Sequence, residues 1–250
     1  ILRDGVDIQP KDFYERLATD KNMPSTSQAT PEEFRNVYST LLDQGYEILS
    51  VHISSKLSGT IDSALQAKKS LKSDSIEIID SLSTSMAMGF QVLSVLRMAK
   101  MGATLAECKA TALEAINHSG VYYAVNTLEF LHRGGRIGGA AAFLGHMLNL
   151  KPLLELKDGK IEAVEKVRTL SKTIDRLLDL AEAKLEGANG PIRLSAVHGN
   201  SPAEAEELLK RAIKRFPASQ VSEAVISSIS PVLGTHTGPG ALGLAYMKGM

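Results

Sequence analysis

The sequence predicts an α/β protein of two domains: a parallel three-layer α/β/α domain, followed by a two-layer α+β domain with a mixed sheet. Two observations support this prediction. Before residue 120, amphipathic helices alternate with short runs of buried, β-branched residues, which is typical of a parallel sheet. After it, a hairpin signal and several strands are interspersed with helices. We therefore place the domains at residues 1–119 and 120–250 and expect a six-stranded sheet in the second.

The elements of the first domain follow from helix caps and apolar runs. A proline in the first turn marks a helix at 10–17. Thr30, Pro31 and Glu33 form a capping box ahead of a helix that ends at Gly45. The remaining expected elements are strands at 47–53 and 75–79, and helices from residue 60 onward, over 86–101 and over 104–118.

The second domain mixes hairpin and helix signals. Asp158 and Gly159 lie between two strand patterns and predict a hairpin turn. Residues 140–150 are apolar except for His146 and Asn149, so we expect a helix that is buried or lines an apolar cavity. The other expected elements are a strand at 121–125, a short helix at 127–132, a glycine-rich basic bend at 133–139, hairpin strands at 151–156 and 160–168, a helix at 171–185, a strand at 192–198, a helix at 202–216, a strand at 222–229, a loop at 235–240 and a strand at 241–246.

Composition excludes several classes of protein. Lys+Arg and Asp+Glu both number 28. The chain has no surplus of basic residues, so we expect no nucleic-acid partner. The single cysteine, Cys108, excludes an internal disulfide and a cysteine-rich zinc site, and it favours a reducing, cytoplasmic setting. No apolar run reaches about 18 residues, so we expect no stable membrane insertion. The histidines lack metal-ligand spacing, so we expect no metal site.

The chain is organised around a strand that leads into a hydroxyl-rich loop, residues 54–60, and then into a helix. Backbone N–H groups at the start of a helix attract an anion. Ser58 and Thr60 add hydroxyl donors, and Gly59 between them allows a close backbone approach. Because no GxxxxGK[ST] or GxGxxG motif is present, a small carboxylate or phosphate is a better candidate than a nucleotide. The alternative is a plain N-cap turn.

Histidines and arginines offer further candidates. His236 lies between threonines in the expected 235–240 loop, where it either shapes the turn or faces an acidic group as a donor. His52 lies inside a strand and is expected to be a core or face residue. Arg136 and Arg168 are either solvated charges or cations held out for a phosphate or a partner. No GxSxG or SxxK motif is present, which favours binding over catalysis by this chain alone.

Seven stretches carry a family resemblance when they are taken together and in order: residues 26–28 with 31–34, 53–60, 79–81, 126–131 with 133–138, 150–152, 166–169 and 234–240. This set resembles the DegV family of bacterial fatty-acid-binding proteins, along nearly the whole chain. The opening strand of that family, with its Thr-Asp-Ser motif, is absent from this sequence. We therefore expect the native protein to have further residues before Ile1.

The resemblance implies two α/β domains with a long-chain fatty acid buried between them, and no other cofactor. Carried over by motif, Thr26, Ser58 and His236 hydrogen-bond the carboxylate of the acid. Ser27, Gly59 and Thr60 flank those positions and are weaker candidates of the same kind.

The resemblance also implies a partner, because members of this family serve as the acyl-presenting subunit of fatty acid kinase. A separate ATP-binding subunit phosphorylates the bound carboxylate to acyl phosphate, which feeds phospholipid synthesis. Arg136 and Arg168 match positions implicated in that exchange and in partner docking. Two other functions stay open: a stand-alone enzyme for a small carboxylated or phosphorylated metabolite, with His236 as general acid or base, and a ligand sensor without a transfer role.

Overall fold

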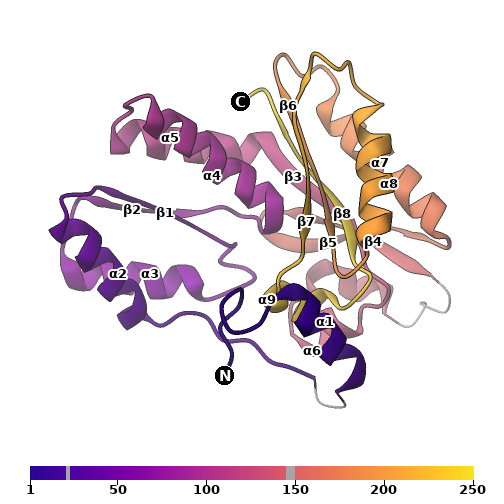
Figure 1. Cartoon of the computed structure of the whole chain (residues 1–250), viewed down its shortest axis with the longest axis horizontal. Coiled ribbons are helices and arrows are strands. Elements are labelled where there is room, and N and C mark those ends of the chain that lie inside the picture. The colour runs from indigo at the N-terminus through magenta and orange to yellow at the C-terminus, as the bar shows by residue number, and fades with distance from the viewer. Residues whose placement is uncertain (21–22, 145–149) are drawn as a thin grey trace. The chain divides into compact units, whose positions relative to one another are not determined.

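The computed structural model describes residues 1–20, 23–144 and 150–250. The chain divides into two compact units (Figure 1). The smaller unit comprises Ser27–Ser119 and the turn Asp158–Lys160, together with Met250. The larger unit comprises Ile1–Thr26, Gly120–Lys157 and Ile161–Gly249. Both contain helices and strands, so the mixed α/β class predicted from the sequence is confirmed.

The smaller unit has three layers around two parallel strands, β1 (Ile48–His52) and β2 (Ile76–Asp80). Helices α2 (Pro31–Asp43) and α3 (Thr60–Leu71) pack on one face around Tyr38, Ala64 and Ile76. Helices α4 (Ser85–Lys100) and α5 (Leu105–His118) pack on the other face around Ile79, Val95 and Cys108. The alternation of helices and buried strands in the sequence thus produces the α/β/α layering.

Two capping boxes fix where helices of the smaller unit begin. Thr30 accepts a hydrogen bond from the backbone N–H of Glu33, and the Glu33 carboxylate accepts one from the backbone N–H of Thr30. Thr104 and Glu107 form the same arrangement at the start of α5. Each box satisfies two backbone donors that the helix itself leaves unpaired.

Among the described residues, no helix is long and apolar enough to cross a membrane.

The larger unit is built on a mixed six-stranded sheet with the order β5-β4-β3-β8-β6-β7. Its strands are β3 (Ser119–Ala124), β4 (Lys151–Lys157), β5 (Lys160–Val167), β6 (Ile192–His198), β7 (Val221–Ser228) and β8 (Leu242–Lys248). Strand β6 pairs parallel to β7 and antiparallel to β8, and β3 pairs antiparallel to β4. Helices α7 (Leu170–Leu185) and α8 (Pro202–Ile213) bury their apolar faces against this sheet.

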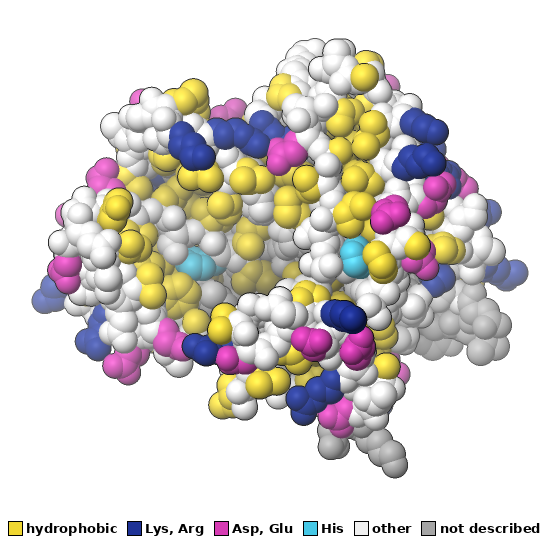
Figure 2. Space-filling model, in the orientation of Figure 1, with side chains coloured by type: hydrophobic (Ala, Val, Ile, Leu, Met, Phe, Trp, Pro, Cys, Tyr) yellow, Lys and Arg dark blue, Asp and Glu magenta, His cyan; other side chains and the backbone are white. Residues whose placement is uncertain are grey.

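Charged side chains of both signs occupy the surface drawn in Figure 2.

Residues 1–26 belong to the larger unit, whereas the sequence analysis places them in the first domain. Helix α1 (Pro10–Thr19) explains the difference. Its Phe13 and Tyr14 are buried and pack against Gly234 of α9 (Pro231–Thr237). Tyr14 Oη also donates a hydrogen bond to the carbonyl oxygen of Ile229, at 3.4 Å. Aromatic packing across more than 200 residues of sequence therefore joins the start of the chain to its end.

The hairpin turn predicted at Asp158 and Gly159 joins β4 to β5, and both residues have the positive φ angles that such a turn requires (50° and 79°). The turn is grouped with the smaller unit rather than with its own strands. There, Ser54 Oγ donates a hydrogen bond of 2.8 Å to the carbonyl oxygen of Gly159.

Two expected elements differ in the structure. The expected helix over 140–150 is instead a 3-10 helix, η1 (Gly138–Phe143), which ends where Leu144 turns to an extended conformation. Residues 145–149 of that prediction lie outside the described residues. The expected loop at 235–240 is wrong in its first half, because the helix α9 extends from Pro231 to Thr237. Proline at its first position and Gly238 after its end, with φ 74°, delimit this helix.

Two leucines of α7 test the packing of the larger unit. Leu177 is fully buried against the sheet, while Leu170 at the start of the same helix is 40% exposed. We expect Leu177→Ala to lower the free energy of unfolding by about 2–5 kcal/mol, because it leaves a cavity. Leu170→Ala should cost no more than about 0.5 kcal/mol. Urea unfolding of both variants provides the measurement, and equal losses would contradict this core.

Candidate functional site

The hydroxyl-rich loop lies in the smaller unit, between the end of β1 and the start of α3. The backbone N–H of Ser58 donates to the carbonyl oxygen of Ser54 at 3.1 Å, which closes the loop on itself. Ser58 Oγ and Thr60 Oγ1 lie 2.8 Å apart, and the backbone N–H of Thr60 donates to Ser58 Oγ at 3.3 Å. Two hydroxyl groups that share one hydrogen bond have one proton left over. The loop can therefore donate to an acceptor outside it.

Gly59 is the N-cap residue of α3 and leaves little room for a side chain. A Cβ atom at this position would lie 3.0 Å from Nε2 of Gln28. The neighbouring Ser27 is exposed. The motif at residues 26–28 and the loop at 54–60 therefore meet in space at Gln28 and Gly59, although some thirty residues separate them.

A second group of predicted site residues lies in the larger unit, where Thr26 meets His236. Thr26 Oγ1 and His236 Nε2 lie 2.9 Å apart and form a hydrogen bond. The other ring nitrogen of His236, Nδ1, is buried and has no hydrogen-bond partner among the described residues. Burial lowers the pKa of His236, and the positive charge of Arg136 lowers it further. The imidazole is therefore neutral at pH 7.

The environment of His236 decides which nitrogen carries its proton. An N–H buried without an acceptor is costlier than an unused lone pair, and the nearby Arg136 cation also favours a lone pair at Nδ1. The proton therefore resides on Nε2, and Nε2–H donates to Thr26 Oγ1. The hydroxyl proton of Thr26 is then left to donate elsewhere, because no other described group bonds to this half-buried side chain. Thr26 presents a donor, and His236 orients it.

Arg136 and Gly134 complete the surroundings of His236. Arg136 is half-buried, and its Nη1 donates a hydrogen bond of 2.6 Å to the carbonyl oxygen of Gly134. A Cβ atom at Gly134 would overlap His236 Nδ1, so only glycine leaves room for the ring. Gly134 follows helix α6 (Glu129–Arg133), which in turn packs against α9. The glycine-rich bend thus accommodates the histidine from a distant part of the sequence.

The structure groups the predicted site residues by unit. Thr26, His236 and Arg136 come together in the larger unit, and Ser58, Gly59 and Thr60 come together in the smaller one. Arg168 is exposed directly after the end of β5, and within the described part of the chain it forms no hydrogen bond or ion pair with Arg136 or His236. Sequence reasoning missed Gly134 and Gln28 as packing partners of the site, because their roles depend on contacts with residues far along the chain.

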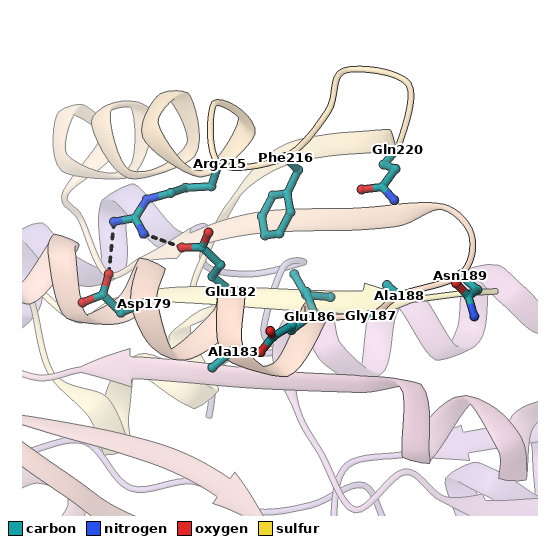
Figure 3. A pocket seen from close by; sticks show the side chains of 11 residues that line it. Asp179, Glu182, Ala183, Glu186, Gly187, Ala188, Asn189, Arg215, Phe216 and Gln220 are labelled. Carbon is teal, nitrogen blue, oxygen red and sulfur yellow. Dashed lines mark hydrogen bonds and ion pairs between the residues drawn. The ribbon is translucent and has the colours of Figure 1, made fainter.

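A groove with a volume of about 580 Å³ lies elsewhere on the larger unit, between the ends of α7 and α8 (Figure 3). Three of the charged side chains that line it pair with one another, since Arg215 forms ion pairs with Asp179 and Glu182 (Figure 3). None of the predicted site residues lines it. Among the described residues, no three side chains of the kinds that ligate metals are gathered so that they could hold an ion.

Comparison with known proteins adds an independent line of evidence. A family model described as an uncharacterised protein of the DegV family matches residues 1–249. A DegV domain-containing protein of Streptomyces coelicolor is 36% identical over 245 residues, which cover 97% of this chain and 85% of that protein. A DegV family protein from Thermus thermophilus, described for its fatty acid binding, is 34% identical, with a TM-score of 0.91 over 98% of this chain and 86% of that one. DegV of Bacillus subtilis, described as a fatty acid binding protein, is 31% identical, with a TM-score of 0.86 over 99% and 86% of the two chains.

The lowered pKa of His236 predicts how stability depends on pH. Because the folded chain holds this imidazole neutral, the unfolded chain takes up its proton first as the pH falls below the ordinary value of 6.5. The free energy of unfolding should therefore decrease below about pH 6.5. Burial lowers the pKa of His52 and His198 in the same direction.

We expect His236→Gln to make this decrease shallower, since glutamine retains a donor but does not titrate. Arg136→Gln should act in the same sense, because removing the cation brings the pKa of His236 closer to its ordinary value. Urea unfolding at pH 7 and about pH 5.5 measures the effect. An unchanged pH dependence in His236→Gln would refute the neutral, buried imidazole.

Proposed function

The chain belongs to the DegV family, and from that premise we propose that it binds a long-chain fatty acid whose carboxylate accepts hydrogen bonds from Thr26 and Ser58. The solved relatives from Thermus thermophilus and Bacillus subtilis are described as binding fatty acids. The observation that carries the proposal is the hydrogen bond between Thr26 Oγ1 and His236 Nε2 beside a buried, unpartnered Nδ1, from which we infer that the Thr26 hydroxyl proton is free to donate. A hydroxyl with a proton and no acceptor suits an anionic oxygen.

The chemistry of the donors fits a carboxylate in a partly buried site. A carboxylate taken out of water must be hydrogen-bonded or become protonated. The hydroxyl groups of Thr26 and of the Ser58–Thr60 pair supply such hydrogen bonds without adding a charge. In this proposal, the donors are Thr26, which His236 orients, and Ser58. Ser27, Gly59 and Thr60 flank these donors and are weaker candidates for binding the same carboxylate.

The acyl chain supplies most of the affinity in this proposal. Burying a methylene group contributes about 0.8 kcal/mol, so a chain of about sixteen carbons contributes roughly 12 kcal/mol of gross transfer free energy. The headgroup donors then have to orient the acid rather than to hold it. Orientation matters if the carboxylate has to react while it is still bound.

We further propose that the chain presents this carboxylate to a separate, ATP-binding kinase subunit, which forms the acyl phosphate used in phospholipid synthesis. Neutral donors support such a role, because a carboxylate locked to a buried guanidinium would be a poorer nucleophile. Arg168 is exposed and so can contact a partner, while Arg136 lies beside His236. The location that fits this exchange is the cytoplasm, where ATP is available.

Lipid extraction and a threonine series test the binding. Protein purified from bacteria should release long-chain fatty acids on extraction, as detected by mass spectrometry. Thr26→Val and Ser58→Ala should each weaken palmitate binding by about tenfold or more, the effect expected for a hydrogen bond to a charged group. Thr26→Ser keeps the hydroxyl and should stay within about threefold of the original affinity. An extract without fatty acid, or equal affinities in the Val and Ser variants, would argue against the proposal.

The kinase step has its own test at Arg168. We expect Arg168→Ala to retain palmitate but to slow acyl phosphate formation about tenfold or more with the partner kinase, because an exposed cation is removed from the docking face. Lys172→Ala, an exposed cation one turn away on α7, is the matched control and should leave the rate unchanged. Loss of palmitate binding in Arg168→Ala would contradict the assignment of this residue to the partner.

A further inference from the structure

A chain of three hydrogen-bonded side chains lies in the smaller unit, outside the predicted site. Tyr38 Oη on α2 donates to Ser50 Oγ on β1 at 2.7 Å. Ser50 Oγ lies 2.8 Å from Nε2 of His52, two residues further along the same face of the strand. His52 is 9% exposed, and Tyr38 is buried as well. The sequence analysis takes His52 as a core or face residue and does not anticipate this arrangement.

The chain determines where the imidazole proton of His52 resides. Burial raises the pKa of Tyr38, so its hydroxyl keeps its proton and donates it to Ser50. Ser50 then has its own proton to donate, and His52 Nε2 is the acceptor within reach. If Nε2 carried the proton instead, the Ser50 hydroxyl would have no acceptor among the described residues. The neutral imidazole therefore carries its proton on Nδ1.

The second nitrogen of His52 is open. Within the described part of the chain, no group accepts a hydrogen bond from His52 Nδ1. Unlike Nδ1 of His236, this atom is not fully buried. Two contacts favour one orientation of the ring: Phe34 packs edge-on against it with ring centroids 5.2 Å apart, and Nε2 is hydrogen-bonded to Ser50. Asp80, opposite His52 in the strand pairing, accepts hydrogen bonds from the backbone N–H groups of Ser55 and Leu82. His52 thus presents one fixed, unused N–H donor.

We propose that His52 is a further ligand-binding residue, whose Nδ1–H donates a hydrogen bond to an oxygen atom of the bound acid. This inference rests on the proposed fatty acid binding. His52 ends β1, directly before the loop that carries Ser58, and ligands of parallel sheets bind at the carboxyl ends of strands. Tyr38 and Ser50 are positioning residues, because they act through the tautomer of His52.

Imidazole ¹⁵N NMR and palmitate titration test the proposal. In the free protein we expect His52 to carry its proton on Nδ1. Adding palmitate should shift that proton signal. A merely structural His52 would show the same proton signal with and without palmitate. In Ser50→Ala, the preference for Nδ1–H should be lost. These spectra remain informative even where a variant at His52 itself is unstable.

Affinity provides the second readout. His52→Phe keeps the ring size but removes the donor, and it should weaken palmitate binding about tenfold. His52→Gln restores an N–H donor and should recover affinity to within about threefold. His118→Phe, at the end of α5 in the same unit, is the control and should bind like the original chain.

An Nε2–H tautomer, or unchanged affinity in His52→Phe while the original chain binds palmitate, would overturn this inference and leave the proposed function intact. If the original chain itself fails to bind palmitate, the proposed function fails, and this inference fails with it.

Discussion

The candidate site depends on a single electrostatic constraint: among the described residues, the imidazole of His236 has no acid to pair with. One of its nitrogens is buried without a partner, and the nearby charge, on Arg136, has the same sign as an imidazolium. The ring therefore stays neutral, and its proton lies on the side of Thr26. That choice converts the threonine hydroxyl into a donor aimed away from the histidine. In the proposed function, a site built in this way attracts an anion through oriented neutral dipoles instead of an opposite charge.

The fold of the larger unit positions His236 beside Thr26. Helix α9 holds His236 in its last turn, and Gly238 ends the helix in a conformation with positive φ. Gly134 leaves the space that the imidazole occupies, and a side chain there would expel the ring. Tyr14 and Phe13 pack on the other side of α9 at Gly234. Three parts of the chain therefore have to fold together before Thr26 can meet His236.

Local features of the structure could be predicted from the sequence, because short-range chemistry determines them. The capping boxes at Thr30 and Thr104 need only two residues three apart, and the hairpin at Asp158 needs only a two-residue turn. The strand, loop and helix around Ser58 follow from an apolar run and a helix start. Motif resemblance then added Thr26 as a candidate and assigned the carboxylate to both Thr26 and His236, without any geometry.

Long-range features could not be predicted in this way. Thr26 and His236 bond across 210 positions of sequence, and no local pattern encodes which residues meet over that separation. The sequence predicts a loop over 235–240 where the short helix α9 ends, because the seven residues of this helix hold too few apolar positions to show a helical period. The tautomers of His236 and His52 depend on which neighbours bury each nitrogen. Such information exists only once the chain is folded.

The direct measurement of the central claim is neutron diffraction from crystals of the deuterium-exchanged protein, which locates the proton on the His236 ring. The account requires deuterium on Nε2, pointing at Thr26 Oγ1, a bare Nδ1, and a Thr26 hydroxyl deuterium directed away from the ring. Deuterium on Nδ1, or on both nitrogens at pH 7, would contradict it, because Thr26 would then donate to His236 or face a cation.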